Sequence, residues 1–197
     1  MNRMYQFLWL ISWPFIGLVY PRKTIGRENI PEGAAIVCAN HSSAIDPFLM
    51  THSLGRGTHL RFMAKVEIFR VPIIGPLLRA AGIFPVDRKG GGAMAIKGAM
   101  KLLKSGEKVA MFPEGTRVST DEESEAKVGA VRLAAKLDVP IVPVYIPREK
   151  RLFRRMRIVI GAPYMVEVDP KTAKSADYEV LAGEMMEKIR LLGTNIK

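Results

Sequence analysis

A histidine and an aspartate five residues apart are the pair in this sequence best suited to chemistry. His41 follows the short apolar run 34–39, which predicts a strand buried on both faces. Asp46 directly precedes Pro47, a pattern typical of the first residues of a helix. His41 and Asp46 therefore lie at the two ends of one tight strand-to-helix loop, where an imidazole and a carboxylate can meet.

A carboxylate that holds an imidazole fixes its tautomer and orientation, so that the ring can take a proton from a hydroxyl group. Ser42 and Ser43 are close by, but neither lies in a Gly-x-Ser-x-Gly turn, which leaves the hydroxyl to a substrate. The spacing alone favours a plainer interpretation, in which Asp46 only caps the helix and His41 only packs. The hypothesis of a general base depends on the rest of the chain.

Size and charge narrow the class of protein. A chain of 197 residues suits one domain with a sizeable core. It carries 30 Lys and Arg against 19 Asp and Glu, a net charge of +11, which favours a polyanionic partner: nucleic acid, an anionic membrane or a phosphorylated substrate. The single cysteine, Cys38, lies in the apolar run and cannot form an internal disulfide, which suits a reducing compartment.

The amino-terminal stretch 4–20 is apolar, contains two tryptophans and is followed by several cations. It is shorter than the ~20 residues needed to cross a bilayer, and Pro14 interrupts it. We therefore predict an interfacial helix, with residues 1–25 as a membrane-associating segment and residues 26–197 as the main domain. A helix docked on the protein's own core is the alternative.

Alternating apolar runs and helical patterns predict the α/β class, with one domain built on a mostly parallel or mixed sheet flanked by helices. Two prolines, Pro140 and Pro143, favour an irregular start or an edge position for the predicted strand 139–146. The predicted strands after the first are 59–64, 83–86, 108–113, 139–146 and 158–160, and the longer predicted helices are 93–104, 126–137 and 178–192.

Polar residues follow several of these strands, and the carboxyl ends of strands are where open α/β sheets bind their ligands. Lys65, Arg88 and Arg117 would bring three cations to the crevice that holds His41. A base beside a group of cations suits a substrate that carries both a nucleophilic hydroxyl and a phosphate. No Cys or His cluster has the spacing of a metal site, so we expect no metal.

Four blocks of the sequence resemble, in order and spacing, those of the glycerolipid acyltransferase family, typified by 1-acylglycerol-3-phosphate O-acyltransferases. Residues 40–46 are similar to the family's NHxxxxD block. The other three similar blocks are 82–88, 112–117 and 139–144. Each block is a weak signal by itself, and the four together are a strong one.

The resemblance implies a role for each matching residue. His41 would deprotonate the sn-2 hydroxyl of the acceptor, and Asp46 would orient it. The implied binding residues are Arg88, Gly115 and Arg117 for the acceptor and its phosphate, Glu114 and Thr116 for the shape of that site, and, by a looser match, Lys65 for the phosphate.

The resemblance also implies partners and a location. The donor would be a fatty acyl thioester of coenzyme A or acyl carrier protein, the acceptor a lysophospholipid, and the product phosphatidic acid. No cofactor, metal or nucleic acid is expected. The basic chain would lie on an anionic membrane, at the cytoplasmic face of the inner (plasma) membrane, peripherally or shallowly inserted.

Three alternatives stay open at this point. The acceptor of a related acyltransferase could be glycerol phosphate, dihydroxyacetone phosphate or an ornithine lipid. The same base with water as nucleophile would make a thioester hydrolase. A basic membrane- or nucleic-acid-binding domain without catalysis would explain the charge but has no use for the histidine and aspartate.

Overall fold

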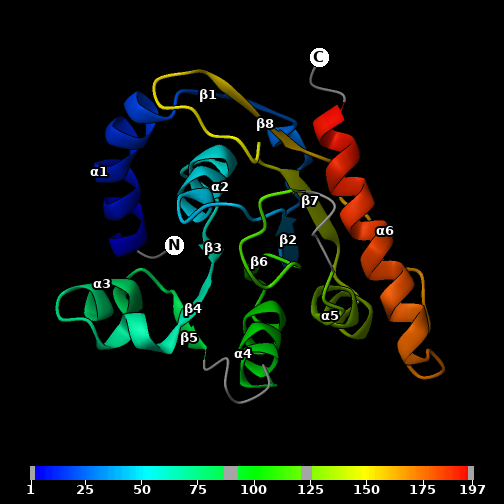
Figure 1. Ribbon diagram of the computed structural model, residues 1–197. Helices are drawn as coiled ribbons and strands as arrows, with labels where there is room; N and C mark the ends of the chain where they lie inside the picture. The colour runs from blue at the N-terminus through cyan, green and yellow to red at the C-terminus, as the bar shows by residue number, and fades with distance from the viewer. Residues whose placement is uncertain (1–2, 87–92, 121–125, 195–197) are drawn as a thin grey trace.

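A mixed six-stranded sheet forms the centre of the protein in the computed structural model, which describes residues 3–86, 93–120 and 126–194 (Figure 1). Its strand order is β1-β8-β7-β2-β6-β3. The bounds are β1 (Arg22–Ile25), β2 (Ala35–Ala39), β3 (Leu60–Arg61), β6 (Lys108–Met111), β7 (Ile141–Tyr145) and β8 (Met156–Ile160). A separate two-stranded parallel sheet pairs β4 (Met63–Lys65) with β5 (Phe84–Val86).

The strands next to β2 run parallel to it, so their carboxyl ends meet at one edge of the sheet. β2 pairs with β6 on one side and β7 on the other, and β3 continues the parallel set beyond β6. β8 is antiparallel to β7, and β1 is parallel to β8. The predicted α/β class, with a mostly parallel or mixed sheet flanked by helices, is confirmed by the mixed main sheet. The residues after β2, β6 and β7 lie close together.

Helices cover both faces of the sheet (Figure 1). α4 (Ala93–Lys104), α5 (Gly129–Leu137) and α6 (Ser175–Thr194) pack on the face that receives Ile36 and Cys38 of β2. α1 (Arg3–Val19) and α2 (Asp46–Leu54) pack on the face that receives Ala35, Val37 and Ala39. All five residues of β2 are buried, because successive side chains of a strand point to opposite faces and both faces are covered.

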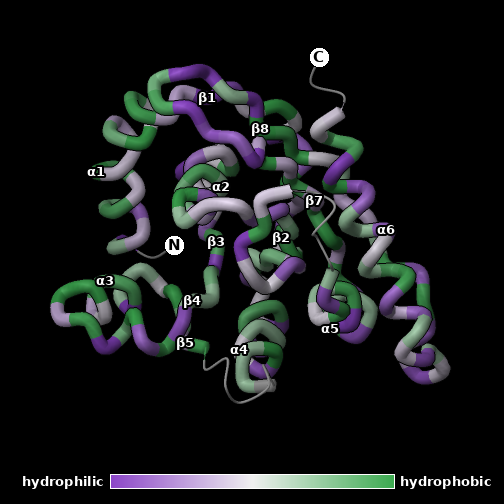
Figure 2. Tube along the Cα trace, in the orientation of Figure 1, coloured by the Kyte–Doolittle hydropathy of each residue, from purple (hydrophilic) through white to green (hydrophobic). Residues whose placement is uncertain are grey.

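The remaining short elements lie at the periphery. They are the 3₁₀ turns η1 (Arg27–Asn29) and η2 (Val66–Arg70) and the helix α3 (Ile74–Ala80). Figure 2 shows hydrophobic residues along α1 and α3, on the outside of the molecule, as well as in the central strands.

The structure differs from the sequence-based expectation in three places. The predicted strand 59–64 is divided between β3 and β4, which belong to different sheets. Residues 22–25, which we assigned to the amino-terminal segment, form the edge strand β1. β7 is an inner strand despite its prolines. The carbonyl of Pro143 accepts the N–H of Gly161, the residue after β8, so the side of Pro143 that lacks an N–H faces the place where the pairing of β7 with β8 ends.

Candidate active site

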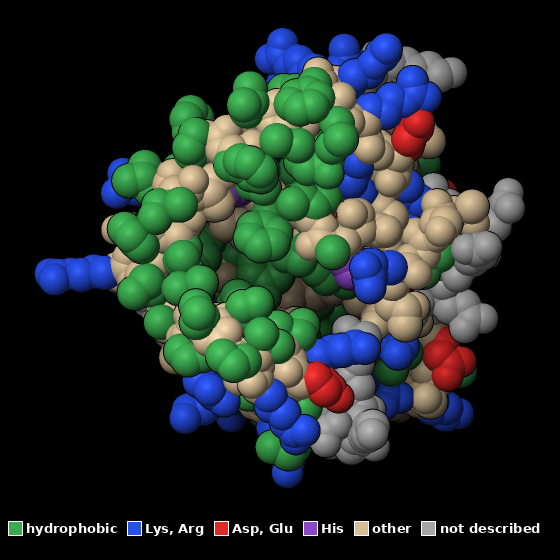
Figure 3. Space-filling view, turned by 60° about the vertical axis from the view of Figure 1, so that its left-hand side comes forward, with side chains coloured by type: hydrophobic (Ala, Val, Ile, Leu, Met, Phe, Trp, Pro, Cys, Tyr) green, Lys and Arg blue, Asp and Glu red, His purple; other side chains and the backbone are tan. Residues whose placement is uncertain are grey.

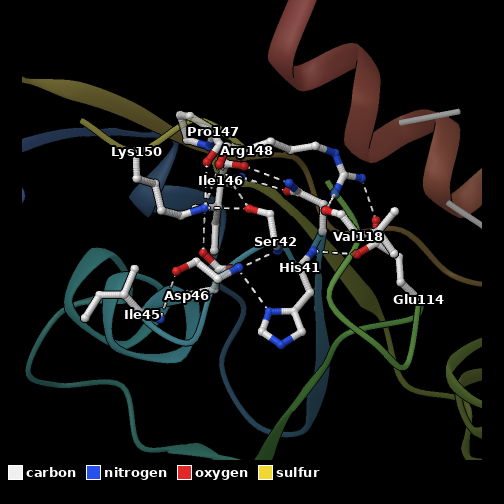
Figure 4. Close-up of polar contacts among 12 residues, drawn as sticks. His41, Ser42, Ile45, Asp46, Glu114, Val118, Ile146, Pro147, Arg148 and Lys150 are labelled. Atoms are coloured by element: carbon white, nitrogen blue, oxygen red, sulfur yellow. Dashed lines mark hydrogen bonds and ion pairs between the residues drawn. The ribbon is translucent and has the colours of Figure 1, made fainter. Parts of the chain in front are cut away.

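His41 and Asp46 meet across the loop between β2 and α2 (Figure 4). The Nδ1 atom of His41 lies 2.9 Å from Oδ2 of Asp46. The position of His41 is set by its neighbour Asn40, whose buried amide group exchanges two hydrogen bonds with the main chain of Ile146 at the end of β7, at 2.7 and 2.9 Å. The sheet therefore delivers the imidazole to a fixed place.

The Asp46 carboxylate does not cap α2 as we expected from the Asp-Pro pattern. Ile45 is the N-cap residue, and no side chain caps this helix end. Instead Oδ2 of Asp46 accepts the backbone N–H groups of Ser42 and Ser43, both at 2.8 Å. The carboxylate thus closes the loop on itself and brings its oxygen to the imidazole.

Asp46 is ionised at neutral pH although its side chain is almost fully buried. Burial raises the pKa of Asp46, but the hydrogen bond with His41, the Lys150 ammonium 2.9 Å from Oδ1 and the N–H of Ser43 lower it, and its pKa lies below the ordinary value. An ionised carboxylate accepts a proton-bearing Nδ1, which leaves the lone pair of His41 on Nε2.

The Nε2 atom of His41 is available to a substrate. Figure 4 shows one ring nitrogen directed towards Asp46 and the other directed away from the surrounding network. Within the described ranges no hydrogen bond engages Nε2, and the ring stacks on Phe112 with centroids 4.2 Å apart. A side chain 16% exposed, held at one nitrogen and open at the other, suits a general base.

Glu114 is buried behind His41. Its carboxylate accepts the backbone N–H of His41 at 2.6 Å and binds the guanidinium of Arg148 at 2.5 Å. Arg148 also donates to the carbonyl of Val118, and the Val118 N–H donates to the carbonyl of His41. Glu114 therefore positions the main chain of His41, and both carboxylate oxygens are bound by groups of the protein itself.

Residues 115–117, directly after Glu114, belong to the turn that follows β6. Gly115 has a φ of 71°, in the left-handed region where a side chain is strained, so this position favours glycine. Thr116 and Arg117 are exposed, and in the described part of the chain no hydrogen bond or ion pair occupies the Arg117 side chain. The bond between Val118 and His41 places this turn beside the imidazole.

The other two predicted cations are less closely tied to the site. Lys65 is exposed at the carboxyl end of β4, in the smaller sheet, where it is in register with Val86 of β5. Arg88 lies outside the described residues. The structure therefore brings together His41, Asp46 and the turn 114–117, and it places Lys65 at the end of a separate sheet.

Two basic residues of the site were missed in the sequence. Arg148 and Lys150 follow β7 and form ion pairs with Glu114 and Asp46 respectively. The signal that could have found them is the one that pointed to His41 and Glu114, since they too follow the carboxyl end of a parallel strand. No group of His, Cys, Asp and Glu suited to a metal ion occurs among the described residues.

Comparison with known proteins decides the family. The sequence model of the Acyltransferase family matches residues 22–147, well over half of the chain. This chain belongs to the acyltransferase family. The family that the four sequence blocks predicted is confirmed, and His41, Asp46 and the turn 114–117 all lie within the matched residues of this acyltransferase.

Three relatives of this acyltransferase carry the same functional name. It is 38% identical over 150 residues to a 1-acyl-sn-glycerol-3-phosphate acyltransferase of Bacillus subtilis (72% of each chain). It is 30% identical over 193 residues to one of Streptococcus pneumoniae (95% of this chain, 71% of that one). It is 35% identical over 133 residues to a chloroplastic one of Arabidopsis thaliana, of whose length it spans 36%.

A solved structure also resembles it. The crystal structure of the 1-acyl-sn-glycerophosphate acyltransferase PlsC from Thermotoga maritima aligns with 96% of this chain and 79% of its own, with a TM-score of 0.64 and 25% sequence identity. The likeness includes the segments outside residues 22–147, so the similarity of fold extends over nearly the whole acyltransferase.

Proposed function

We propose that this acyltransferase moves a fatty acyl group from an acyl thioester of coenzyme A or acyl carrier protein to the sn-2 hydroxyl of 1-acylglycerol-3-phosphate, giving phosphatidic acid. The observation that carries the proposal is the geometry of His41, bound to an ionised carboxylate at Nδ1 and open at Nε2. The shared name of the relatives supports the choice of acceptor.

The proposed reaction needs one base and a good leaving group. Nε2 of His41 takes the proton of the acceptor hydroxyl as its oxygen attacks the thioester carbonyl carbon, and Asp46 stabilises the imidazolium that forms. The C–S bond then breaks, and the sulfur leaves as a thiolate that takes up the proton held by His41, which restores the neutral base. A thiol of pKa about 8.5 leaves readily without a strong acid. No acyl-enzyme, metal or prosthetic group is part of this proposal.

Recognition of the phosphate is assigned to three of the predicted cations. Arg117 projects from the turn beside His41, and Lys65 and Arg88 follow the two strands of the smaller sheet, which have parallel carboxyl ends. A guanidinium suits a phosphate because it offers several N–H donors in a fixed plane. The buried Glu114 supports the site by holding the main chain of His41, and Gly115 gives the turn its left-handed bend.

The experiment that tests the reaction compares wild type with His41→Ala and, as a matched control, His59→Ala. We expect acyl transfer to lysophosphatidic acid to fall by roughly a thousandfold or more in His41→Ala, because the base is lost. His59 bonds the carbonyl of Ala81 and lies before β3, at the opposite ends of the strands, so its variant should keep its activity. Equal activity of His41→Ala and wild type would remove His41 from the reaction.

Assays with and without acceptor separate transfer from hydrolysis. We expect release of free thiol from the donor to depend on lysophosphatidic acid, since the acceptor supplies the nucleophile. Thiol release that ignores the acceptor would instead assign a thioester hydrolase. A panel of glycerol phosphate, dihydroxyacetone phosphate and a lyso-ornithine lipid tests the remaining acceptors.

We also propose that the enzyme lies peripherally on an anionic membrane, at the cytoplasmic face. In the described part of the chain no helix has both the length and the apolar character to cross a bilayer. Figure 3 shows two groups of apolar side chains, over α1 and over α3, with a hollow between them and cations around the edge. The exposed apolar side chains include Phe7, Leu10, Trp13 and Phe15 of α1 and Ile73, Ile74 and Leu77 at α3.

A further inference from the structure

The loop between β7 and β8, residues 146–155, connects two different environments. Its first half lies against His41 and Asp46, and its second half ends beside the last turn of α1. It carries five cations and a single acid, Glu149. The family comparison matches residues only as far as 147, so most of the loop lies beyond the part that assigned the family.

The first half of the loop places a buried ammonium on the Asp46 carboxylate. The Lys150 side chain is 6% exposed, and its Nζ lies 2.9 Å from Oδ1 of Asp46. The same Nζ donates to Oγ of Ser42 at 2.7 Å and to the carbonyl of Pro147 at 2.8 Å (Figure 4). A buried ammonium is costly unless it is paired, so these contacts fix Lys150 and the carboxylate together.

Lys150 completes the set of partners around Asp46. Oδ2 is occupied by His41 Nδ1 and two backbone N–H groups of the loop, and Oδ1 faces Lys150. The carboxylate is therefore fixed from two directions, by its own loop and by the β7–β8 loop. The orientation of the imidazole depends on both.

The second half of the loop exposes apolar side chains that the protein itself does not cover. Leu152 is 56% and Phe153 66% exposed. Phe153 has a φ of 57°, a conformation that is uncommon for a bulky side chain, and its N–H donates to the carbonyl of Val19 in α1 at 2.8 Å. The loop thus holds an aromatic ring in solvent, next to the helix whose apolar face is also exposed.

The charges around this tip identify the surface that it suits. Arg151, Arg154 and Arg155 flank Leu152 and Phe153 and are exposed. Apolar side chains with cations on both sides complement a bilayer that carries anionic headgroups, where the rings enter the interface and the arginines stay at headgroup level. The tip is also continuous with the exposed face of α1 through the bond to Val19.

We propose that the β7–β8 loop is a membrane-contacting arm of the active site: Leu152 and Phe153 enter an anionic bilayer, while Lys150 is a positioning residue that holds Asp46 and, through it, His41. The arm places the base beside the membrane that supplies a lipid acceptor. The second part rests on the proposed acyl transfer, and the first does not.

The membrane contact is tested by sedimentation with vesicles of phosphatidylcholine mixed with phosphatidylglycerol. The variant is Leu152→Ser with Phe153→Ser, and the matched control is Val180→Ser with Leu191→Ser, two similarly exposed apolar residues of α6 on the other side of the molecule (Figure 1). We expect partitioning to fall about tenfold in the tip variant and to be unchanged in the control. Equal partitioning of tip variant and wild type would overturn the membrane arm.

The positioning role is tested with Lys150→Met and Lys150→Arg. With a short-chain acceptor dissolved in water, we expect Lys150→Met to lower kcat at least about tenfold with acceptor KM within about twofold, and Lys150→Arg to recover a large part of the loss. A rise in KM alone for Lys150→Met would overturn the positioning role.

The membrane arm predicts a further difference in activity. In the tip variant the loss of acyl transfer with a vesicle-borne acceptor should exceed the loss with the dissolved acceptor by about tenfold.

A readout without substrate separates this inference from the proposed reaction. The chain has three histidines, so NMR can resolve the signals of the His41 imidazole. Asp46, Glu114, Arg148 and Lys150 are the charged groups around it. If Lys150 holds Asp46 against Nδ1, the ¹⁵N signals should show one ring tautomer, protonated at Nδ1, in wild type and Lys150→Arg, and a mixture of tautomers in Lys150→Met. The same single tautomer in all three proteins would overturn the role, whatever the enzyme acylates.

Discussion

At the scale of single residues, Asp46 shows how a buried carboxylate can stay charged beside an imidazole. A buried charge is tolerated only where hydrogen bonds and counter-charges replace water. Asp46 has the imidazole, two backbone N–H groups and the Lys150 ammonium. These partners keep it ionised and leave His41 with one direction in which to accept a proton.

Asp46→Asn should lower kcat by about a thousandfold or more with little change in KM, because an amide does not stabilise the imidazolium. The variant also tests stability. Since the folded-state pKa of Asp46 is lowered, its contribution is present above the ordinary pKa of about 3.9 and disappears as pH falls through the folded value. Urea unfolding at several pH values should show a steeper loss of stability below pH ~4 for wild type than for Asp46→Asn.

Arg117→Ala should weaken the use of phosphate-bearing acceptors. We expect acceptor KM to rise about tenfold for lysophosphatidic acid and to change little for a monoacylglycerol, because we propose that the lost cation binds the phosphate. Arg56→Ala, in an exposed turn after α2 at the opposite ends of the strands, is the matched control. Equal losses with both acceptors would contradict the assignment of Arg117.

At the scale of elements, α1 is held on α2 and the following loop by polar contacts as well as by packing. Tyr5 donates to the carbonyl of Thr58 at 3.0 Å, and Ser12 lies 3.0 Å from Nε2 of His52. His52 is buried, and its Nδ1 has no hydrogen-bond partner among the described residues. Burial, and then the charge of Arg22, lower the pKa of His52 to about 4, so α1 sits on a neutral imidazole.

Acid pH should therefore weaken the docking of α1 on α2. A histidine whose folded-state pKa is lowered from 6.5 to about 4 costs stability as pH falls between these values, by up to about 3 kcal/mol. Both tryptophans of the chain lie on α1, so their fluorescence reports on this helix. We expect an emission shift between pH 6.5 and 4 in wild type and a much smaller one in His52→Gln. The same shift in both proteins would show that another group controls the docking.

At the scale of the whole molecule, charge and exposed apolar surface act together. The net charge of +11 accompanies exposed apolar side chains on α1, on α3 and at the tip of the β7–β8 loop. Apolar insertion and attraction to anionic lipid are separate contributions, with ~1 kcal/mol per cation near the surface. Neither contribution requires a spanning helix.

Binding to phosphatidylcholine–phosphatidylglycerol vesicles should weaken as salt rises, because the Debye length shortens from about 10 Å at 0.1 M to about 3 Å at 1 M. Vesicles of phosphatidylcholine alone should bind more weakly and lose the salt dependence, since only the apolar part remains. Vesicle sedimentation across a salt series measures both. Equal binding to the two kinds of vesicle would show that charge has no part in the association.

Patterns of a few neighbouring residues predicted the strands whose burial shows in their own residue types. The apolar run 34–39 predicted β2, because a short strand with both faces covered needs apolar residues throughout. The predicted strand 59–64 is divided at Phe62, because β3 pairs with β6 and β4 pairs with β5. The sequence of a strand does not specify which strands it pairs with. The half-buried alternation of β1 was obscured by its two cations, which an edge strand tolerates.

The sequence by itself determined the family, the α/β class and the loop that joins His41 to Asp46, because these depend on short blocks of residue types and on the order of those blocks along the chain. Only the tertiary structure decided that Glu114 lies behind the main chain of His41 and that Lys150 holds Asp46. Those contacts join residues 73 or more positions apart. They exist because β6 and β7 flank β2, and strand order is settled by the packing of the whole chain rather than by any local pattern.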